Sequence, residues 1–265
     1  MIWRKVFLLF FVLFFISGII FAADIRVGNI RLVLNERTGN YLLYYLTNGR
    51  YEALFNREQT TSFTSIYVDG NIFRLGNRPF RTRFENQSGN PSVIFEVSNL
   101  RVTKVFTFIK TVSSHAVNGV MITYNIQNIS NSNIFMGLRV LIDTELGEGR
   151  GLTPFFTNNR EITNETLIGI TANDMYWISR GRRASLMGSI INPIDNTAKK
   201  PDFIHFANWK RLFDAPWMLN YLEGHTFNND SAVCYFFEPT ILETGRTISY
   251  SIILSAEDTS WYNML

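Results

Sequence analysis

The chain has 265 residues, of which 46% are hydrophobic and 15% aromatic, and its formal net charge at pH 7 is +3. Arg4 and Lys5 supply two of those charges, so the net charge falls to +1 without the first residues. Such a small positive excess gives no support to nucleic-acid binding or to binding of an anionic membrane. Cys234 is the only cysteine, which excludes an intramolecular disulfide, and its apolar neighbours predict a buried thiol.

The first 23 residues have the layout of a secretory signal peptide. Two basic residues precede an apolar run from Val6 to Phe21, and Ala22 and Ala23 mark a cleavage point. We expect cleavage after one of these alanines, which leaves residues 24–265 as a single extracytoplasmic domain, either periplasmic or secreted. The alternative is an uncleaved leader that acts as an N-terminal anchor, and this is the only contact with a membrane that the sequence suggests.

The rest of the chain consists of short β-like segments. Turn dipeptides such as Asn48-Gly49 and Asp69-Gly70, which accept positive φ angles, separate them. The best helix candidate is Phe206 to Leu212, and no helical pattern after the leader exceeds about ten residues. The sequence therefore predicts an all-β fold, a large two-sheet antiparallel sandwich with few short helices. The main strands are expected at residues 30–34, 41–46, 62–68, 72–75, 93–97, 102–109, 120–126, 136–143, 166–170, 184–190, 232–237 and 247–254.

Three segments carry a resemblance to known proteins. They are Gly137-Leu-Arg-Val-Leu-Ile-Asp-Thr-Glu-Leu-Gly147, Asp230-Ser-Ala-Val-Cys-Tyr-Phe-Phe-Glu-Pro239 and Phe206-Ala-Asn-Trp209. They resemble a poorly characterised group of exported bacterial β-sandwich domains, for which the resemblance implies no catalytic residues. More loosely, the strand order from Ile25 to Asp143 resembles the supersandwich of galactose-mutarotase-like and carbohydrate-binding proteins. This second resemblance implies a fold, and a fold alone does not assign a function.

The strand that ends at Asp143 holds the first candidate site. Side chains alternate along a strand, so Arg139, Asp143 and Glu145 share one face, and the two carboxylates lie about 7 Å apart. With Glu148 and the nearby glycines, they form an oxygen-rich loop that suits sugar hydroxyls or a calcium ion, the only cofactor that the sequence suggests. The other interpretation is that Asp143 caps the loop by binding backbone amides while the glutamates are solvated.

Aromatic and hydrogen-bonding side chains gather in a second candidate site. Sugars stack their apolar faces on flat rings while amides and carboxylates bind their hydroxyls, so this segment is the best candidate for glycan binding. The alternative is a hydrophobic plug over one end of the sandwich, because each large ring buries about 150 to 250 Å². The segment contains His205, Asn208, Trp209, Lys210, Asp214, Trp217 and Tyr221, and Asp230 follows at the start of the next strand.

Catalytic motifs are absent from the sequence. It has no nucleophile elbow, zinc-binding helix motif, phosphate loop or paired cysteines, and only three histidines, of which His115 and His225 lie in apparent surface loops. We therefore expect an exported non-catalytic binding or structural module of the cell envelope that recognises a glycan or a protein partner. One alternative is a mutarotase-like carbohydrate enzyme that uses His205 with Asp143 or Asp230. A second alternative is an outer-membrane β-barrel, which the short strands with two apolar faces disfavour.

Overall fold

The computed structural model describes residues 22–87, 89–144, 146, 155–169, 173–195, 197–260 and 262, and it confirms the all-β antiparallel sandwich. One sheet runs in the order β1 (Ala22–Val27), β2 (Ile30–Asn35), β3 (Tyr41–Thr47) and β4 (Arg50–Ala53). A six-stranded sheet runs in the order β14 (Thr166–Gly169), β17 (Phe203–Asn208), β18 (Ser231–Leu242), β11 (Ile134–Asp143), β5 (Phe63–Val68) and β6 (Asn71–Arg74). A nine-stranded sheet runs in the order β13 (Glu161–Ile162), β12 (Phe155–Thr157), β15 (Tyr176–Arg180), β16 (Ser185–Ser189), β19 (Thr247–Ala256), β10 (Gly119–Asn128), β9 (Leu100–Ile109), β8 (Asn90–Val97) and β7 (Arg81–Gln87).

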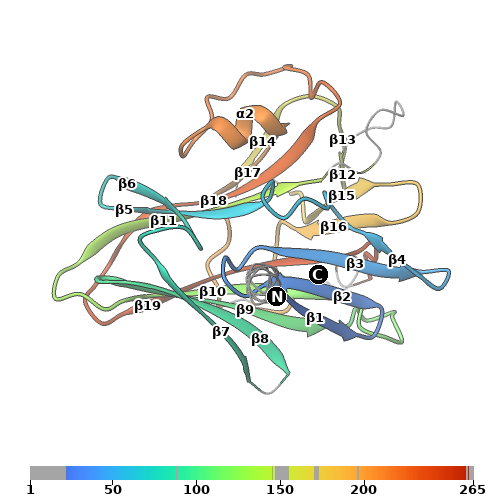
Figure 1. The fold of residues 1–265 in the computed structure, drawn as a ribbon. Coiled ribbons are helices and arrows are strands. Elements are labelled where there is room, and N and C mark those ends of the chain that lie inside the picture. Colours follow the sequence, from blue (N-terminus) through green and yellow to red (C-terminus); the bar gives the residue numbers. More distant parts are fainter. Residues whose placement is uncertain are drawn as a thin grey trace, which may run out of the picture.

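The six-stranded and nine-stranded sheets lie above one another (Figure 1), and the main hydrophobic core consists of buried side chains from both sheets and from β2 and β3 of the four-stranded sheet. Alternation along the strands turns one row of apolar side chains inward, as in β11, where Leu138, Val140 and Ile142 are buried in this core. Buried hydrogen bonds cross this core between described residues, and two of them join side-chain oxygen or nitrogen atoms. The hydroxyls of Thr64 and Tyr124 lie 2.9 Å apart, and the Trp177 indole donates to the Tyr235 hydroxyl at 2.7 Å. These bonds satisfy polar groups that water does not reach.

A second, smaller core lies on the opposite, outer face of the six-stranded sheet. There the helix α2 (Trp209–Asp214) packs across β17, β18 and β11 (Figure 1). Leu212 of the helix is buried with Leu141, Cys234 and Phe236 of the sheet. The predicted burial of the single cysteine is confirmed, and this burial raises the pKa of the Cys234 thiol.

The structure differs from the sequence-based prediction at the helix. Residues 206–208 continue strand β17, and the helix begins only at Trp209, because Asn208 accepts the backbone N–H of Arg211 and thereby caps it. Ala22 and Ala23 pair with Asn35 and Leu34 in β1 and β2, while cleavage of the leader stays a prediction. In the described part of the chain, no helix is long and apolar enough to cross a membrane.

Candidate functional site

The outer face of the six-stranded sheet brings together most of the residues that the sequence analysis selected. Arg139 comes from β11 and His205 from β17, and both contact residues 209–230, which we call the cover. The helix α2 and the rest of the cover lie over one face of the six-stranded sheet (Figure 1). Glu145 and Glu148 lie outside the described residues, so the calcium interpretation stays a prediction. Among the described residues, no three His, Cys, Asp or Glu side chains are grouped so as to hold a metal ion.

Arg139 is buried and binds the C-terminal end of α2. Its guanidinium donates to the carbonyl of Leu212 and, at 3.4 Å, to the carbonyl of Ala215. Its guanidinium carbon also lies 5.7 and 5.6 Å from the ring centroids of Phe63 and Phe236. A cation at the carbonyl end of a helix and against aromatic faces is stabilised by both. Arg139 therefore holds the cover on the sheet.

His205 contacts a carboxylate, but this carboxylate belongs to Glu165 and not to Asp143 or Asp230. The imidazole Nε2 lies 3.0 Å from Glu165 Oε1, which also accepts the backbone N–H of Leu222 at 3.0 Å. Arg211 Nη2 lies 3.2 Å from the other carboxylate oxygen. Burial lowers the pKa of His205, and this outweighs the opposing effect of Glu165. The pair is sealed under the cover, and Glu165 ties the cover to the sheet.

Asn208, Trp209 and Asp230 fix the two ends of the cover, which meet where the backbone N–H of Trp209 donates to the carbonyl of Asp230. The Asn208 amide caps α2 through its oxygen and donates to the carbonyl of Phe227 at 2.7 Å through its nitrogen. The Trp209 indole donates to the carbonyl of Thr61 at 3.1 Å. Burial raises the pKa of Asp230 more than a hydrogen bond from the Lys210 backbone amide lowers it. All three residues thus have structural partners within the chain.

Asp143 and Asp214 are separate from each other and from the buried His205. Asp143 is buried at the end of β11, where its carboxylate accepts the side-chain amide of Asn56 at 2.8 Å and its own N–H donates to the Ser62 hydroxyl. Asp214 is exposed at the end of α2 and forms an ion pair with Lys210. Asp143 therefore ties the loop before β5 to the sheet.

Next to the cover, three aromatic rings lie near one another on the outer face of the sheet. Tyr67 of β5 lies between Phe135 of β11 and Trp217 of the cover, with ring centroids 6.1 and 5.6 Å away, respectively. We call these three rings the aromatic ledge. Phe135 is 44% exposed and its cross-strand neighbour Ile241 is 66% exposed. Trp209 is packed against the sheet, as the plug interpretation predicts, whereas Trp217 is half-buried beside this exposed apolar surface, and glycan binding by the segment stays a prediction.

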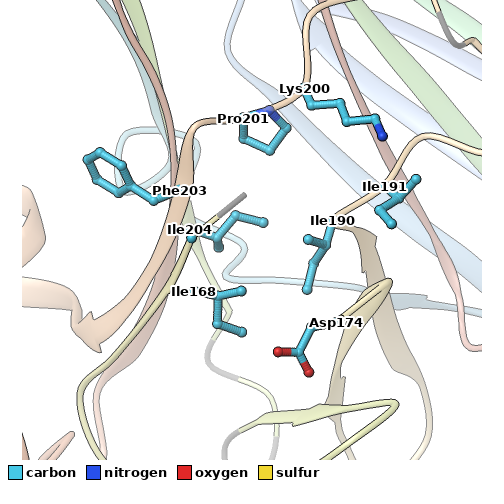
Figure 2. Close-up of a pocket in the computed structure, with 9 residues that line it drawn as sticks. Ile168, Asp174, Ile190, Ile191, Lys200, Pro201, Phe203 and Ile204 are labelled. Carbon is cyan, nitrogen blue, oxygen red and sulfur yellow. The ribbon is translucent and has the colours of Figure 1, made fainter. Parts of the chain in front are cut away.

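The described cavities do not include His205. One cavity of about 40 Å³ lies between β14, β17 and the end of β16, and Figure 2 shows Ile168, Ile190 and Ile204 around it. Its acidic member, Asp174, is bound by Arg160 at 2.8 Å. A space of this size holds water and not a sugar ring. A larger cavity of about 270 Å³ opens at another end of the sandwich, beside the turn between β5 and β6.

Sequence reasoning missed Glu165, Tyr67 and Phe135. Glu165 follows an Asn-rich loop and gives no local signal, since its role comes from a contact with His205, which is distant in the sequence. Tyr67 and Phe135 belong to ordinary strand patterns, and only the pairing of β5 with β11 makes them neighbours. His115 is exposed and His225 half-buried, as expected of loop residues.

No family model and no curated protein sequence matches the chain. Its fold is similar to that of a galactose mutarotase related enzyme from Lactobacillus acidophilus, with 9% identity, a TM-score of 0.51 and coverage of 91% of this chain and 98% of the other. A putative aldose 1-epimerase from Escherichia coli K12 gives 8% identity, a TM-score of 0.54 and coverage of 89% and 99%. A polysaccharide lyase gives 8% identity and a TM-score of 0.52, but only 34% of its chain is covered. These similarities show a galactose-mutarotase-like fold and do not assign an activity.

Proposed function

We propose that the protein is an exported, non-catalytic carbohydrate-recognition module whose binding surface is the aromatic ledge. The observation that carries this proposal is the arrangement of Tyr67, Phe135 and Trp217, three rings that lie beside one another, Phe135 exposed and the other two half-buried. The ring of Tyr67 makes an angle of 89° with that of Phe135 and 48° with that of Trp217, so each ring offers its own face to the apolar side of a sugar. The carbohydrate-related fold of the chain supports the same ligand class.

We propose a non-catalytic role because the candidate catalytic side chains are bound by other residues of the chain. A general acid or base must come within hydrogen-bond reach of its substrate. His205 is only 1% exposed, and its Nε2 is engaged by Glu165 beneath the cover. Asp143 is engaged by Asn56. These side chains stabilise the fold in the state that the structure shows, and no sugar reaches them unless the cover moves.

The test is a glycan array probed with the purified chain, followed by titration of the best glycan against three variants. Tyr67→Ala and Trp217→Ala should each weaken binding at least tenfold, because each removes a stacking surface. Tyr51→Ala is the matched control, since Tyr51 is a half-buried ring of β4 in the four-stranded sheet. The proposal is wrong if no glycan binds, or if the glycan that binds is retained equally by the ledge variants.

The second candidate is a carbohydrate-active enzyme, which the His205 to Glu165 contact favours. A histidine and a carboxylate 3.0 Å apart form an acid and base pair of the kind that opening and closing a sugar ring requires. This candidate needs the cover to open. It predicts that the chain speeds the interconversion of α- and β-D-glucose, measured by polarimetry, and that Glu165→Gln abolishes the acceleration. An unchanged rate of interconversion would leave the module as the better description.

A further inference from the structure

The larger described cavity lies at one end of the sandwich, outside the ledge and far in sequence from the His205 pair. The hairpin of β5 and β6, the segment before β7 and the turn between β8 and β9 surround it. Its volume is about 270 Å³. Pockets for small ligands begin near this size, at about 300 Å³, so the space suits one small molecule and not a chain of several sugars. We call it the end pocket.

Apolar rings and uncharged polar groups line the end pocket together. Phe73 and Phe80 meet edge to face, with ring centroids 6.1 Å apart, and Pro79 adds another apolar surface. The turn between β8 and β9 contributes Ser98 and Asn99 to the lining. Within the described part of the chain, the side chains of Ser98 and Asn99 form no hydrogen bond, so their donors and acceptors are free to bind a ligand.

The charge of the lining narrows the ligand class. Asp69 is the only charged residue among those that line the pocket, and its Oδ1 already accepts the backbone N–H of Phe135 at 2.8 Å. Without a lysine or arginine, the lining offers nothing to neutralise a phosphate or a carboxylate. A single engaged carboxylate is too few ligands for a hard cation. The lining fits a neutral molecule with an apolar face and several hydroxyls.

We propose that the end pocket binds a single uncharged sugar ring. The apolar face of the ring lies against Phe73 and Phe80, and its hydroxyls exchange hydrogen bonds with Asn99, Ser98 and Asn71. The pocket and the aromatic ledge are separate sites that meet at the turn between β5 and β6, where Asp69 lines the pocket and holds the backbone of Phe135. This inference goes beyond the proposed function, because a single ring in the pocket needs no stacking on the ledge.

The test uses the full chain and saturation-transfer NMR with three neutral monosaccharides, D-glucose, D-galactose and N-acetyl-D-glucosamine, and with inorganic phosphate as an anionic probe followed by phosphorus NMR. We expect at least one monosaccharide to bind and phosphate not to bind. Asn99→Leu should weaken the monosaccharide at least fivefold, because it removes the donor and the acceptor of the amide. Asn71→Leu, on a different hairpin, should act in the same direction and keeps the test valid if one variant fails to fold.

Two controls separate this site from the ledge and from general effects. Asn90→Leu makes the same substitution at an exposed position of the hairpin between β7 and β8, and it should leave binding unchanged. Trp217→Ala should also leave the monosaccharide bound, even where it abolishes binding of a longer glycan. The inference is overturned if no neutral monosaccharide binds, if phosphate binds instead, or if Asn99→Leu and Asn71→Leu both bind as the wild type does.

Discussion

The buried Lys104 makes the free energy of unfolding of this protein rise as the pH increases above neutrality. The side chain comes from β9 and is only 3% exposed, and its amine donates to the carbonyl of Gly39 at 3.2 Å. The rings of Tyr41 and Tyr124 lie 4.2 and 5.5 Å from the amine. No carboxylate of the described residues forms an ion pair with it. Burial therefore lowers the pKa of Lys104 from its ordinary value of 10.5 to about 7.

Proton linkage gives the direction and the size of the change in the free energy of unfolding. Between pH 7 and about 10, the unfolded chain holds a proton on this amine that the folded chain has released, so the free energy of unfolding rises with pH. With a folded pKa of about 7, the rise between pH 7.0 and 8.5 is about 1.5 kcal/mol. The comparison stops at about pH 8.5 because burial raises the pKa of Cys234 and of Tyr41. At higher pH, these two groups lower the free energy of unfolding as the pH rises.

The perturbation that tests this reasoning is Lys104→Met, which keeps the volume of the side chain and removes its charge. We expect the variant to be more stable than the wild type by about 1 to 3 kcal/mol at pH 7, as when other buried charges give way to apolar groups. Urea denaturation at pH 7.0 and 8.5 should show this advantage shrinking by about 1.5 kcal/mol. Lys110→Met, at an exposed lysine, is the control. A variant that is less stable at both pH values, or whose advantage stays constant, would refute the argument.

Three further outcomes test how the cover and its supports are held. Asn208→Ala removes the cap of α2 and should lower the free energy of unfolding by about 1 kcal/mol, whereas Asp214→Ala at the exposed end of the helix should change it by less than about 0.5 kcal/mol. Asp143→Ala should cost about 1 to 3 kcal/mol, because it leaves the Asn56 amide without its acceptor. If Asp143→Ala and Asp230→Ala both keep the wild-type melting temperature and abolish glycan binding, both acids belong to a ligand site instead. Cys234 should react with a thiol reagent only after denaturation, and rapid labelling of the native chain would contradict its burial.

Alternation along the chain was enough to predict most of the strands. β9, for example, buries Val102 and Phe106 on one side, as the period of two predicts, and the same period places Lys104 in the core with them. The same pattern does not predict strand β7, because its sequence, Arg-Thr-Arg-Phe-Glu-Asn-Gln, is polar and lies at the edge of the sheet, where no apolar alternation is required. The predicted helix begins three residues before the observed one, because Phe206, which belongs to β17, fits both periods.

The candidate site was only partly predictable, for a physical reason. Local composition identified the aromatic segment that forms most of the cover. The partners of that segment come from distant positions, since Glu165 meets His205 and Tyr67 meets Trp217 only after the six-stranded sheet has formed. Long-range pairing of this kind leaves no trace in residue spacing. The sequence could therefore locate Trp217 but not the ledge to which it contributes.

The cover closes off His205 from solvent and also supplies one ring of the aromatic ledge, and the proposed function depends on both. Its helix end is bound by Arg139, and Leu222 of the same segment donates to Glu165, so the buried His205 is closed off from the side that faces solvent. Trp217, between these two attachment points, packs against Phe236 on the covered side and against Tyr67 on the open side. The segment that removes the polar face from contact with ligands thus also supplies one ring of the ledge. A movement that lifted residues 209–222 as one segment would expose His205 and also carry Trp217 away from Tyr67, so in such a movement catalysis at the buried pair and stacking on the complete ledge would exclude each other.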